Sequence, residues 1–399
     1  MVAPRIGVYT GTGSSHSWLW FMTLCERLGW DEVCCLDEAT LCRDRLADCD
    51  VLAVSGGDTF AIAEALGAAG AATIRGFIEG GGLYLGACAG AYLAMNSSKP
   101  PLHYFNWAPV KIANLSRLRP PAPAGPLVEK FAMAYGSDFV YHPARDAVQL
   151  KLEDPGRSRQ TGCLAAPIYG GPAMIAGPEV KVLARYSGFT PKTVFLSTRT
   201  LADQTLIDKA AIVKTTLKNG TLFLCGPHME HPRFPEANAV VADMLAGHNR
   251  PVAAAHRRRY HNARRPCAKG AGTLVHLRRQ LSNARIAAAG LEWTPVSWLV
   301  GRKIYEPAHL REFIEAIWSR VNWLQKTGVA QEHIAAAGLL ADGAATVSGL
   351  LRNLKATLDG NGDGRAIAGQ VVEGLRRLAM DFFNLYFLAL AEVSACARK

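Results

Sequence analysis

The chain has 399 residues, of which 49% are hydrophobic and 19% charged. This composition is typical of a globular protein and excludes a disordered one, and the length allows two domains. The formal net charge is +11, and the whole excess lies in residues 250–399, which hold 22 basic and 11 acidic side chains. The shift in charge predicts a domain boundary between an N-terminal domain, 1–249, and a basic, mainly helical domain, 250–399.

The ten cysteines show no paired spacing of the kind that binds zinc, which predicts reduced thiols and no metal centre in a cytoplasmic protein. The first predicted strand begins at Ile6, so we expect no signal peptide. The apolar C-terminal stretch, residues 375–397, is interrupted by charged side chains and falls short of a membrane span.

The N-terminal third alternates short apolar runs with helical patterns. Strands are predicted at residues 6–10, 33–36 and 51–55, and helical segments at 59–79. This alternation favours a mostly parallel sheet of the flavodoxin-like type. The Gly-rich loop at residues 11–15 has neither a full dinucleotide fingerprint nor a phosphate-binding lysine, so no cofactor is predicted.

The chemistry of the chain centres on residues 83–94. Leu83–Leu85 reads as a buried strand, and the chain then turns at Gly86–Gly90 into a helix. The turn has a glycine two residues to either side of Cys88, the pattern that lets a nucleophile protrude from a strained strand-to-helix turn. The alternative is a buried structural cysteine at a tight turn.

Two further stretches favour the nucleophile. Residues 51–58 form an apolar strand that ends at Gly56 and Gly57, whose amides suit an oxyanion hole. A second strand, 221–225, is followed by His228 and Glu230, a base and an orienting carboxylate. Open α/β sheets hold their sites at such strand ends.

These motifs resemble the class I glutamine amidotransferase superfamily, and most closely the amidotransferase-like domain at the N-terminus of some biotin-protein ligases. The matching segments within residues 4–248 are 5–14, 55–58, 86–92, 169–172 and 226–230. The resemblance implies Cys88 as nucleophile, His228 as base and Glu230 as orienting acid. It also implies the amides of Gly57 and Ala89 as oxyanion donors.

Position 92 departs from that family. Glutamine-hydrolysing members usually carry Gln or Glu four residues after the nucleophile, where it helps to hold the substrate, and this chain has Tyr92. The difference counts against cleavage of free glutamine. It also leaves open a different class of function, a binding or regulatory module that kept the fold without turnover.

Between nucleophile and base, Pro-rich connections and shorter strands at 148–152, 173–175, 180–186 and 210–214 predict an insertion that walls the substrate pocket. Beyond residue 250 the chain reads as helix, for example at 309–324. The basic run 256–265 suits nucleic acid or an acidic partner, but no nucleic-acid-binding module accompanies it, so nucleic acid is not favoured.

One loop in the C-terminal half suits calcium. Asp359, Asn361 and Asp363 occupy the first, third and fifth positions of an EF-hand loop, with Gly364 at the sixth. The twelfth position is Gln370, which lacks the bidentate carboxylate, and a glycine-rich turn between two helices is the alternative.

Taken together, the motifs predict a cysteine-dependent hydrolase or amide transferase that acts on a small amide through a thioester at Cys88. If ammonia is the product, a synthetase partner is implied, because no ATP site is evident. The alternatives are the inactive binding module and binding of nucleic acid or an anionic partner through the basic half.

Overall fold

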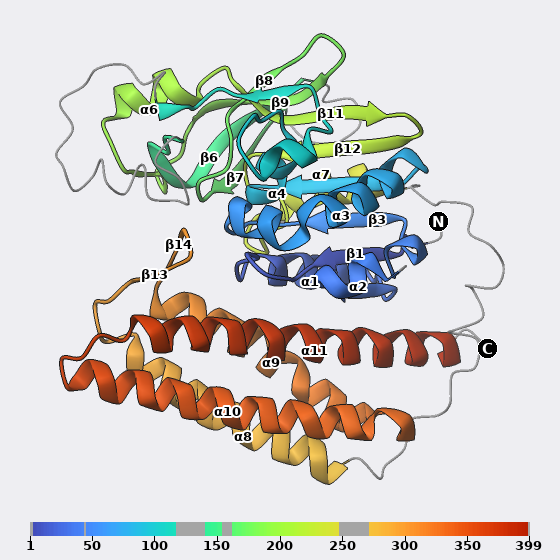
Figure 1. Cartoon of the computed structure of the whole chain (residues 1–399), viewed down its shortest axis with the longest axis vertical. Coiled ribbons are helices and arrows are strands. Elements are labelled where there is room, and N and C mark those ends of the chain that lie inside the picture. Colours follow the sequence, from blue (N-terminus) through green and yellow to red (C-terminus); the bar gives the residue numbers. More distant parts are fainter. Residues whose placement is uncertain (1–2, 44, 117–139, 154–161, 247–270, 398–399) are drawn as a thin grey trace. The chain divides into compact units, whose positions relative to one another are not determined.

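The computed structural model describes residues 3–43, 45–116, 140–153, 162–246 and 271–397 (Figure 1). The chain forms two compact units. The first comprises residues 1–30, 36–250 and 301–303, and the second residues 31–35, 251–300 and 304–399. The predicted boundary at 249/250 and the basic run 256–265 lie outside the described residues. Each unit is described by itself below.

The sheet that carries the site begins with short strands joined by helices. Strands β1 (Ile6–Tyr9), β3 (Val51–Val54), β4 (Leu83–Ala87) and β12 (Gly220–Cys225) lie side by side in the order β12-β4-β3-β1, and all three pairings are parallel. Strand β2 (Val33–Leu36) follows β1 at the edge. These strands are apolar throughout because helices cover both faces of the sheet.

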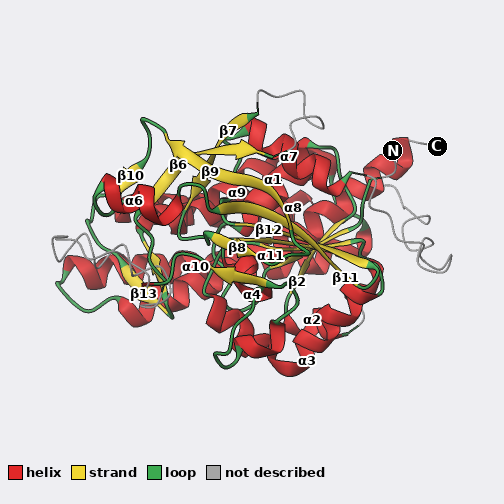
Figure 2. Cartoon of the chain, turned by 90° about the horizontal axis from the view of Figure 1, so that it is seen from above, coloured by secondary structure: helices red, strands yellow, loops and turns green. Residues whose placement is uncertain are grey.

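Helices lie between and after these strands in the chain. They are α1 (Trp18–Arg27), α2 (Glu38–Cys42), α3 (Thr59–Glu79), α4 (Ala89–Ala94) and α7 (Pro235–Leu245). In Figure 2, α1 and α7 lie on one side of the strands and α2 and α3 on the other. Helix α3 begins where the Asp58 carboxylate accepts hydrogen bonds from the amides of Phe60 and Ala61.

Between α4 and β12 the strand pairings are antiparallel. Strand β11 (Ala210–Leu217) pairs antiparallel with β12, and the sheet continues outward through β9 (Lys181–Phe189), β6 (Ala144–Leu152) and β10 (Val194–Phe195). Strands β5 (Val110–Ile112), β7 (Cys163–Ile168) and β8 (Met174–Ala176) pair beside this path, and α6 (Arg199–Leu206) precedes β11. This region is the insertion predicted between Cys88 and His228.

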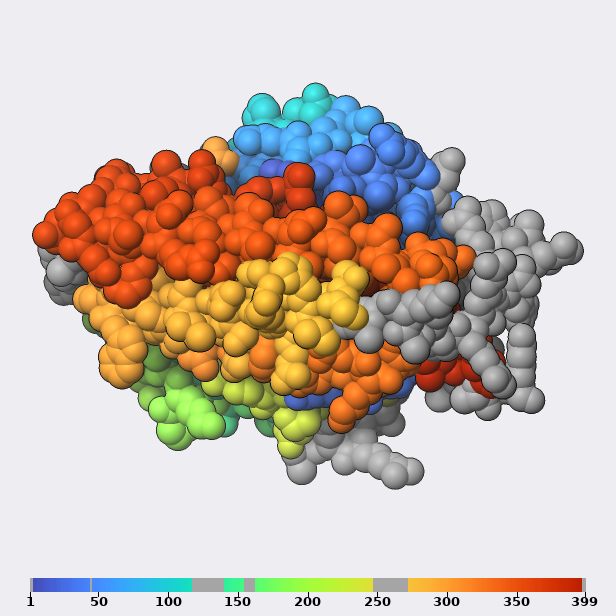
Figure 3. Space-filling model, turned by 90° about the horizontal axis from the view of Figure 1, so that it is seen from below, coloured from blue at the N-terminus to red at the C-terminus, as the bar shows by residue number. Residues whose placement is uncertain are grey.

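In its described residues, the second unit has four long helices. They are α8 (Ala271–Leu291), α9 (Pro307–Thr327), α10 (Ile334–Asp359) and α11 (Arg365–Ala397). The strands β13 (Trp298–Val300) and β14 (Lys303–Tyr305) come between α8 and α9 in the sequence, and Lys303 belongs to the first unit. Figure 3 shows α8 and α10 side by side on one face. The structure thus confirms the predicted fold class, a mostly parallel α/β sheet followed by a mainly helical part.

The helix predicted at 309–324 is confirmed within α9, and its stripe Leu310, Phe313, Ile317 and Leu324 is fully buried.

By length and composition alone, three described helical stretches could cross a membrane: 59–79, 331–359 and 365–396.

Candidate active site

The predicted elbow is a strained turn between β4 and α4. Cys88 has φ 52° and ψ −108°, a backbone conformation that non-glycine residues rarely adopt, at a cost of about 1–3 kcal/mol. The flanking glycines are needed because a side chain at either position would collide with the backbone. A Cβ atom would lie 2.4 Å from the Gly90 carbonyl oxygen if added to Gly86, and 2.0 Å from the Val54 carbonyl oxygen if added to Gly90. The surrounding strands therefore hold the turn in its strained form.

Three sequence segments meet around Cys88 because their strands are neighbours. Val54 in β3 pairs with Gly86 in β4, and Cys225 in β12 pairs with Ala87. The residues that follow these strands, including Ser55, Cys88 and His228, therefore emerge at the same edge of the sheet.

His228 and Glu230 form a buried pair. The Nδ1 atom of His228 lies 2.7 Å from Oε1 of Glu230, and the two residues are only 2% and 1% exposed. The backbone amide of His228 donates to the Pro167 carbonyl, and the Trp20 ring meets the imidazole edge-on at 5.0 Å between centroids. The ring orientation of His228 is therefore fixed from three directions.

The charges of this site shift two pKa values in opposite directions. Burial raises the pKa of the Cys88 thiol, but His228 and, less strongly, Lys303 outweigh burial, so that the pKa lies below its ordinary value of 9.0. Burial lowers the pKa of His228, but Glu230 and Cys88 outweigh it and raise the pKa to about 9. Each group therefore shifts the pKa of the other in the direction that favours a thiolate beside an imidazolium.

A chain of serine hydroxyls supports Glu230, and sequence reasoning missed it. Ser55 Oγ donates to Glu230 Oε1 at 2.9 Å and contacts Ser17 Oγ at 2.9 Å. The Gly56 amide donates to the same Ser17 hydroxyl at 2.9 Å. The network links the carboxylate to the Gly-rich turn after β3. Ser17 belongs to the loop before α1, so its only signal in the sequence was a polar stretch after the first strand.

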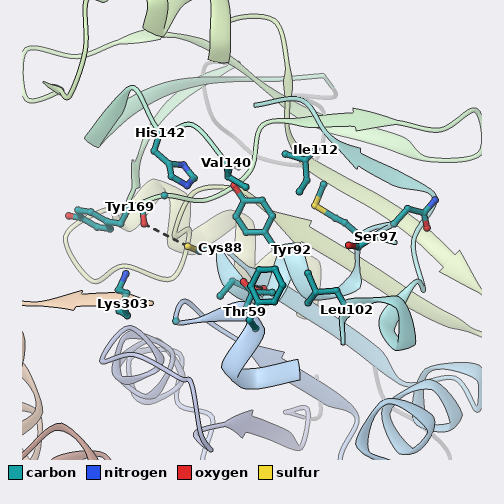
Figure 4. A pocket seen from close by; sticks show the side chains of 16 residues that line it. Thr59, Cys88, Tyr92, Ser97, Leu102, Ile112, Val140, His142, Tyr169 and Lys303 are labelled. Carbon is teal, nitrogen blue, oxygen red and sulfur yellow. Dashed lines mark hydrogen bonds between the residues drawn. The ribbon is translucent and has the colours of Figure 1, made fainter. Parts of the chain in front are cut away.

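The pocket beside Cys88 contains most of the predicted binding residues (Figure 4). It is lined by Gly57, Thr59, Phe60, Cys88, Ala89, Tyr92, Met95, Asn96, Ser97, Leu102, Ile112, Val140, His142, Tyr169, Gly170 and Lys303. Gly56 is outside this lining, and its amide is used by Ser17.

The amides of Gly57 and Ala89 differ from that of Gly56 in their hydrogen bonding. Within the described residues neither donates a backbone hydrogen bond, and both residues line the pocket with Cys88. The Cys88 thiol itself donates to the backbone carbonyl of Tyr169 at 3.8 Å. Gly57, Ala89 and the Cys88 thiol thus line one cavity.

Tyr92, His142 and Lys303 surround the sulfur on the pocket side (Figure 4). The Tyr92 hydroxyl accepts a hydrogen bond from the Asn114 amide at 3.5 Å. Burial and, less strongly, Lys303 lower the pKa of His142 to about 3, so this imidazole is neutral at pH 7. Neither His142 nor Lys303 is among the predicted site residues, since nothing in the sequence places either beside Cys88.

The predicted calcium loop connects α10 to α11. Both Asp359 carboxylate oxygens accept from Lys355, at 2.7 and 2.8 Å, and Asp363 pairs with Arg365 at 3.1 Å. Asn361 has a φ of 58°. The two carboxylates of this loop therefore already face cations of the chain.

Comparison with known proteins supports the predicted resemblance. Residues 5–106 match a family model described as biotin-protein ligase, N terminal. The matched segment begins at Arg5, one residue before β1, includes the elbow at Cys88, and ends before His228. No curated protein matches the chain.

Solved structures show only distant likeness. A ThuA-like protein from Bacteroides uniformis is 13% identical, with a TM-score of 0.36, over 61% of this chain and 91% of that one. A cytoplasmic protein from Salmonella typhimurium, STM3548, is 11% identical, with a TM-score of 0.36, over 60% and 97%. A β-galactosidase from Bacillus circulans is 10% identical, with a TM-score of 0.34, over 60% and 30%. Over residues 5–106, then, the chain is similar to the N-terminal part of biotin-protein ligases, as its motifs predict.

Proposed function

We propose that this protein is a cysteine-dependent hydrolase or amide transferase of the amidotransferase type. The observation that carries the proposal is the strained Cys88 beside the buried His228–Glu230 pair, whose 2.7 Å contact orients the imidazole. A structural cysteine has no use for a strained backbone, an adjacent base and a pocket.

The reaction uses the thiolate–imidazolium pair. The sulfur of Cys88 attacks an amide carbonyl carbon, a C–S bond forms, and the carbonyl electron pair moves to oxygen. The amides of Gly57 and Ala89 bind this oxyanion. As the C–N bond breaks, His228 gives its proton to the leaving amine and a thioester remains.

Water completes the cycle. His228 takes a proton from water, the hydroxide adds to the thioester carbonyl, and the C–S bond breaks. The acid leaves, and the thiolate–imidazolium pair is restored. An acceptor amine in place of water would give amide transfer. Glu230 keeps Nδ1 of His228 protonated throughout, so that Nε2 exchanges the proton.

The pocket favours a small amide other than free glutamine. Tyr92 stands where glutamine-hydrolysing relatives carry Gln or Glu, and its phenol lines the pocket. Burial lowers the pKa of Lys303, whereas Cys88 and Asp58 raise it. Burial is the stronger effect, so the pKa lies below its ordinary value. A lysine at this wall favours a substrate with an anionic group near the scissile amide.

Tyr92 also favours a second candidate, a module that binds without turnover. Its ring lies in the cavity that contains Cys88, and its hydroxyl is paired with Asn114. In that case the pocket would bind a ligand without reacting with it, or Cys88 would carry an acyl group that water does not hydrolyse.

Transfer of an acyl group from p-nitrophenyl acetate separates these functions. The full chain should release nitrophenol in a burst and carry an acetyl group on Cys88, identified by peptide mass spectrometry. Cys88→Ser should abolish the adduct at this position, and His228→Ala should slow its formation by about 100-fold or more. Cys42→Ser, at an exposed thiol on α2, is the control that should leave the burst unchanged.

The outcomes are distinct. Acetyl-Cys88 that turns over supports the hydrolase, and acetyl-Cys88 that persists supports the module without turnover. If the acetyl group is distributed over Cys42, Cys163 and Cys396 and spares Cys88, the proposed nucleophile is wrong.

A further inference from the structure

We propose that Glu332, His333 and Glu392 of the second unit bind a divalent transition-metal ion, with Zn²⁺ as the ion of choice. Glu332 and His333 end the 3₁₀ helix η7 (Gln331–His333) that leads into α10, and Glu392 lies near the end of α11. The three residues are remote in the chain from Cys88 and take no part in the function proposed above.

The spacing of the three side chains fits a metal ion. One ligand atom from each residue lies within 4.8 Å of the other two. His333 Nε2 lies 3.4 Å from Glu392 Oε1 and 3.8 Å from Glu332 Oε1. In a tetrahedral zinc site with bonds of about 2.0–2.1 Å, neighbouring ligand atoms are about 3.3–3.4 Å apart. The distance between His333 Nε2 and Glu392 Oε1 has this value. A small rotation of the Glu332 side chain would bring its Oε1 atom to the same distance from His333 Nε2.

The hydrogen bonding of the cluster independently points to a ligand. His333 Nε2 is buried and has no hydrogen-bond partner among the described residues. Glu392 is only 9% exposed, and no hydrogen bond of its carboxylate is found in the described part of the chain. Buried polar atoms usually have a partner, and leaving one without costs about 1–3 kcal/mol.

An ion pair alone does not explain this arrangement. A charge-assisted hydrogen bond from an imidazolium to a carboxylate is typically about 2.7–2.9 Å long. The 3.4 Å separation of His333 Nε2 and Glu392 Oε1 is longer, and the pair lacks hydrogen-bond geometry. Two lone-pair donors that face each other without a shared proton are what a metal site requires.

The ligand set defines the class of ion. One neutral imidazole and two carboxylates carry a charge of −2, which a divalent cation balances, and imidazole suits Zn²⁺ better than Ca²⁺ or Mg²⁺. Three protein ligands leave a coordination position for water. The Glu332 side chain is 59% exposed, so an ion can reach the cluster from solvent.

Equilibrium dialysis of the full chain against Zn²⁺ tests the site. Wild-type protein should bind one ion more than either His333→Ala or Glu392→Gln, each of which should weaken that binding by at least about tenfold. Glu332→Gln, at an exposed position that cannot disturb the fold, should weaken it as well. Asp342→Asn is the matched control, because Asp342 is an exposed carboxylate on α10 outside the cluster.

Cobalt separates this site from the thiols. Co²⁺ bound here should give weak visible bands without the intense near-ultraviolet band of a cobalt–thiolate bond, and the visible bands should disappear in His333→Ala. Zn²⁺ should also raise the melting temperature of wild type and of Asp342→Asn, and not that of the three ligand variants. Equal zinc binding by wild type and all three ligand variants, or cobalt spectra showing thiolate ligation only, would overturn the proposal.

Discussion

At the scale of single residues, the elbow depends on the absence of side-chain atoms as much as on the thiol. Gly90 lies in the first turn of α4, where alanine would ordinarily be the better helix former. A Cβ there would lie 2.0 Å from the Val54 carbonyl oxygen, which is backbone and cannot rotate away. Packing against β3 therefore decides this residue, and helix propensity does not.

Gly90→Ala should accordingly destabilise the protein by about 1–3 kcal/mol or more, because α4 must shift away from β3. Gly76→Ala is the matched control within α3, where an added Cβ meets nothing within 4 Å. It should stabilise the fold by about 0.5–1 kcal/mol. Urea unfolding measures both. Equal effects of the two substitutions would contradict the role given to Gly90.

Ser55 supports the buried carboxylate at the same scale. Glu230 Oε2 has no hydrogen-bond partner in the described part of the chain, so Oε1 and its bonds from Ser55 and His228 carry the stabilisation of this charge. Ser55→Ala should lower the free energy of unfolding by about 1.5–3 kcal/mol, the contribution of a hydrogen bond to a charged group. Ser197→Ala, whose hydroxyl bonds only to a neighbouring backbone carbonyl, should change it by less than about 0.5 kcal/mol. A Ser55→Ala protein as stable as wild type would show that Ser55 does not support Glu230.

At the scale of elements, the sequence predicted the parallel part of the sheet well. Apolar runs at β1, β3 and β4 alternate with amphipathic helices, and local pattern suffices to locate them. It predicted the antiparallel part less completely. Strand β6 is nine residues long, and only its second half has the apolar alternation that marks a strand. Its first half is defined by pairing with β10, a contact between segments far apart in the chain.

The hairpin β13–β14 was not predicted at all. Each of its strands is three residues long, and a period of two cannot be recognised over so few positions. The sequence predicts helix for this region, as for the rest of the C-terminal half. The long helices α8–α11 confirm that prediction elsewhere, and the hairpin is the exception.

The loop between α10 and α11 gives a prediction at this scale. Since Asp359 and Asp363 already pair with Lys355 and Arg365, we expect no calcium binding there at millimolar concentration. Equilibrium calcium titration of wild type and of Asp359→Asn should give the same result. Saturable calcium uptake that Asp359→Asn abolishes would instead establish the EF-hand-like site.

At the scale of the whole molecule, the arrangement of the candidate site could be predicted only in part. Cys88, His228 and Glu230 could be identified because their motifs are local and their strands end at one edge of the sheet. Ser17 and Lys303 could not, because their places depend on tertiary packing across segments far apart in the sequence. The first compact unit includes residues 301–303, beyond the predicted domain boundary.

The position of Lys303 beside Cys88 can be tested through the charge of the lysine. Lys303 lowers the pKa of the Cys88 thiol, so Lys303→Met should raise that pKa and slow alkylation of Cys88 at pH 7 by several-fold. Lys326→Met, at the end of α9, is the control that should leave the rate unchanged. The same rate in Lys303→Met and wild type would show that this lysine does not act on the thiol.

The most direct test of the proposed function is the pH dependence of iodoacetamide labelling, followed at each cysteine by mass spectrometry. Cys88 should be labelled at lower pH than an ordinary thiol, because His228 lowers the pKa of its thiol. Cys25, whose pKa burial raises to about 12, should stay unlabelled, and exposed Cys42 provides the reference thiol. His228→Ala should move the labelling of Cys88 to higher pH. If Cys88 reacts no faster than Cys42 near neutral pH, and His228→Ala changes nothing, the catalytic account is wrong.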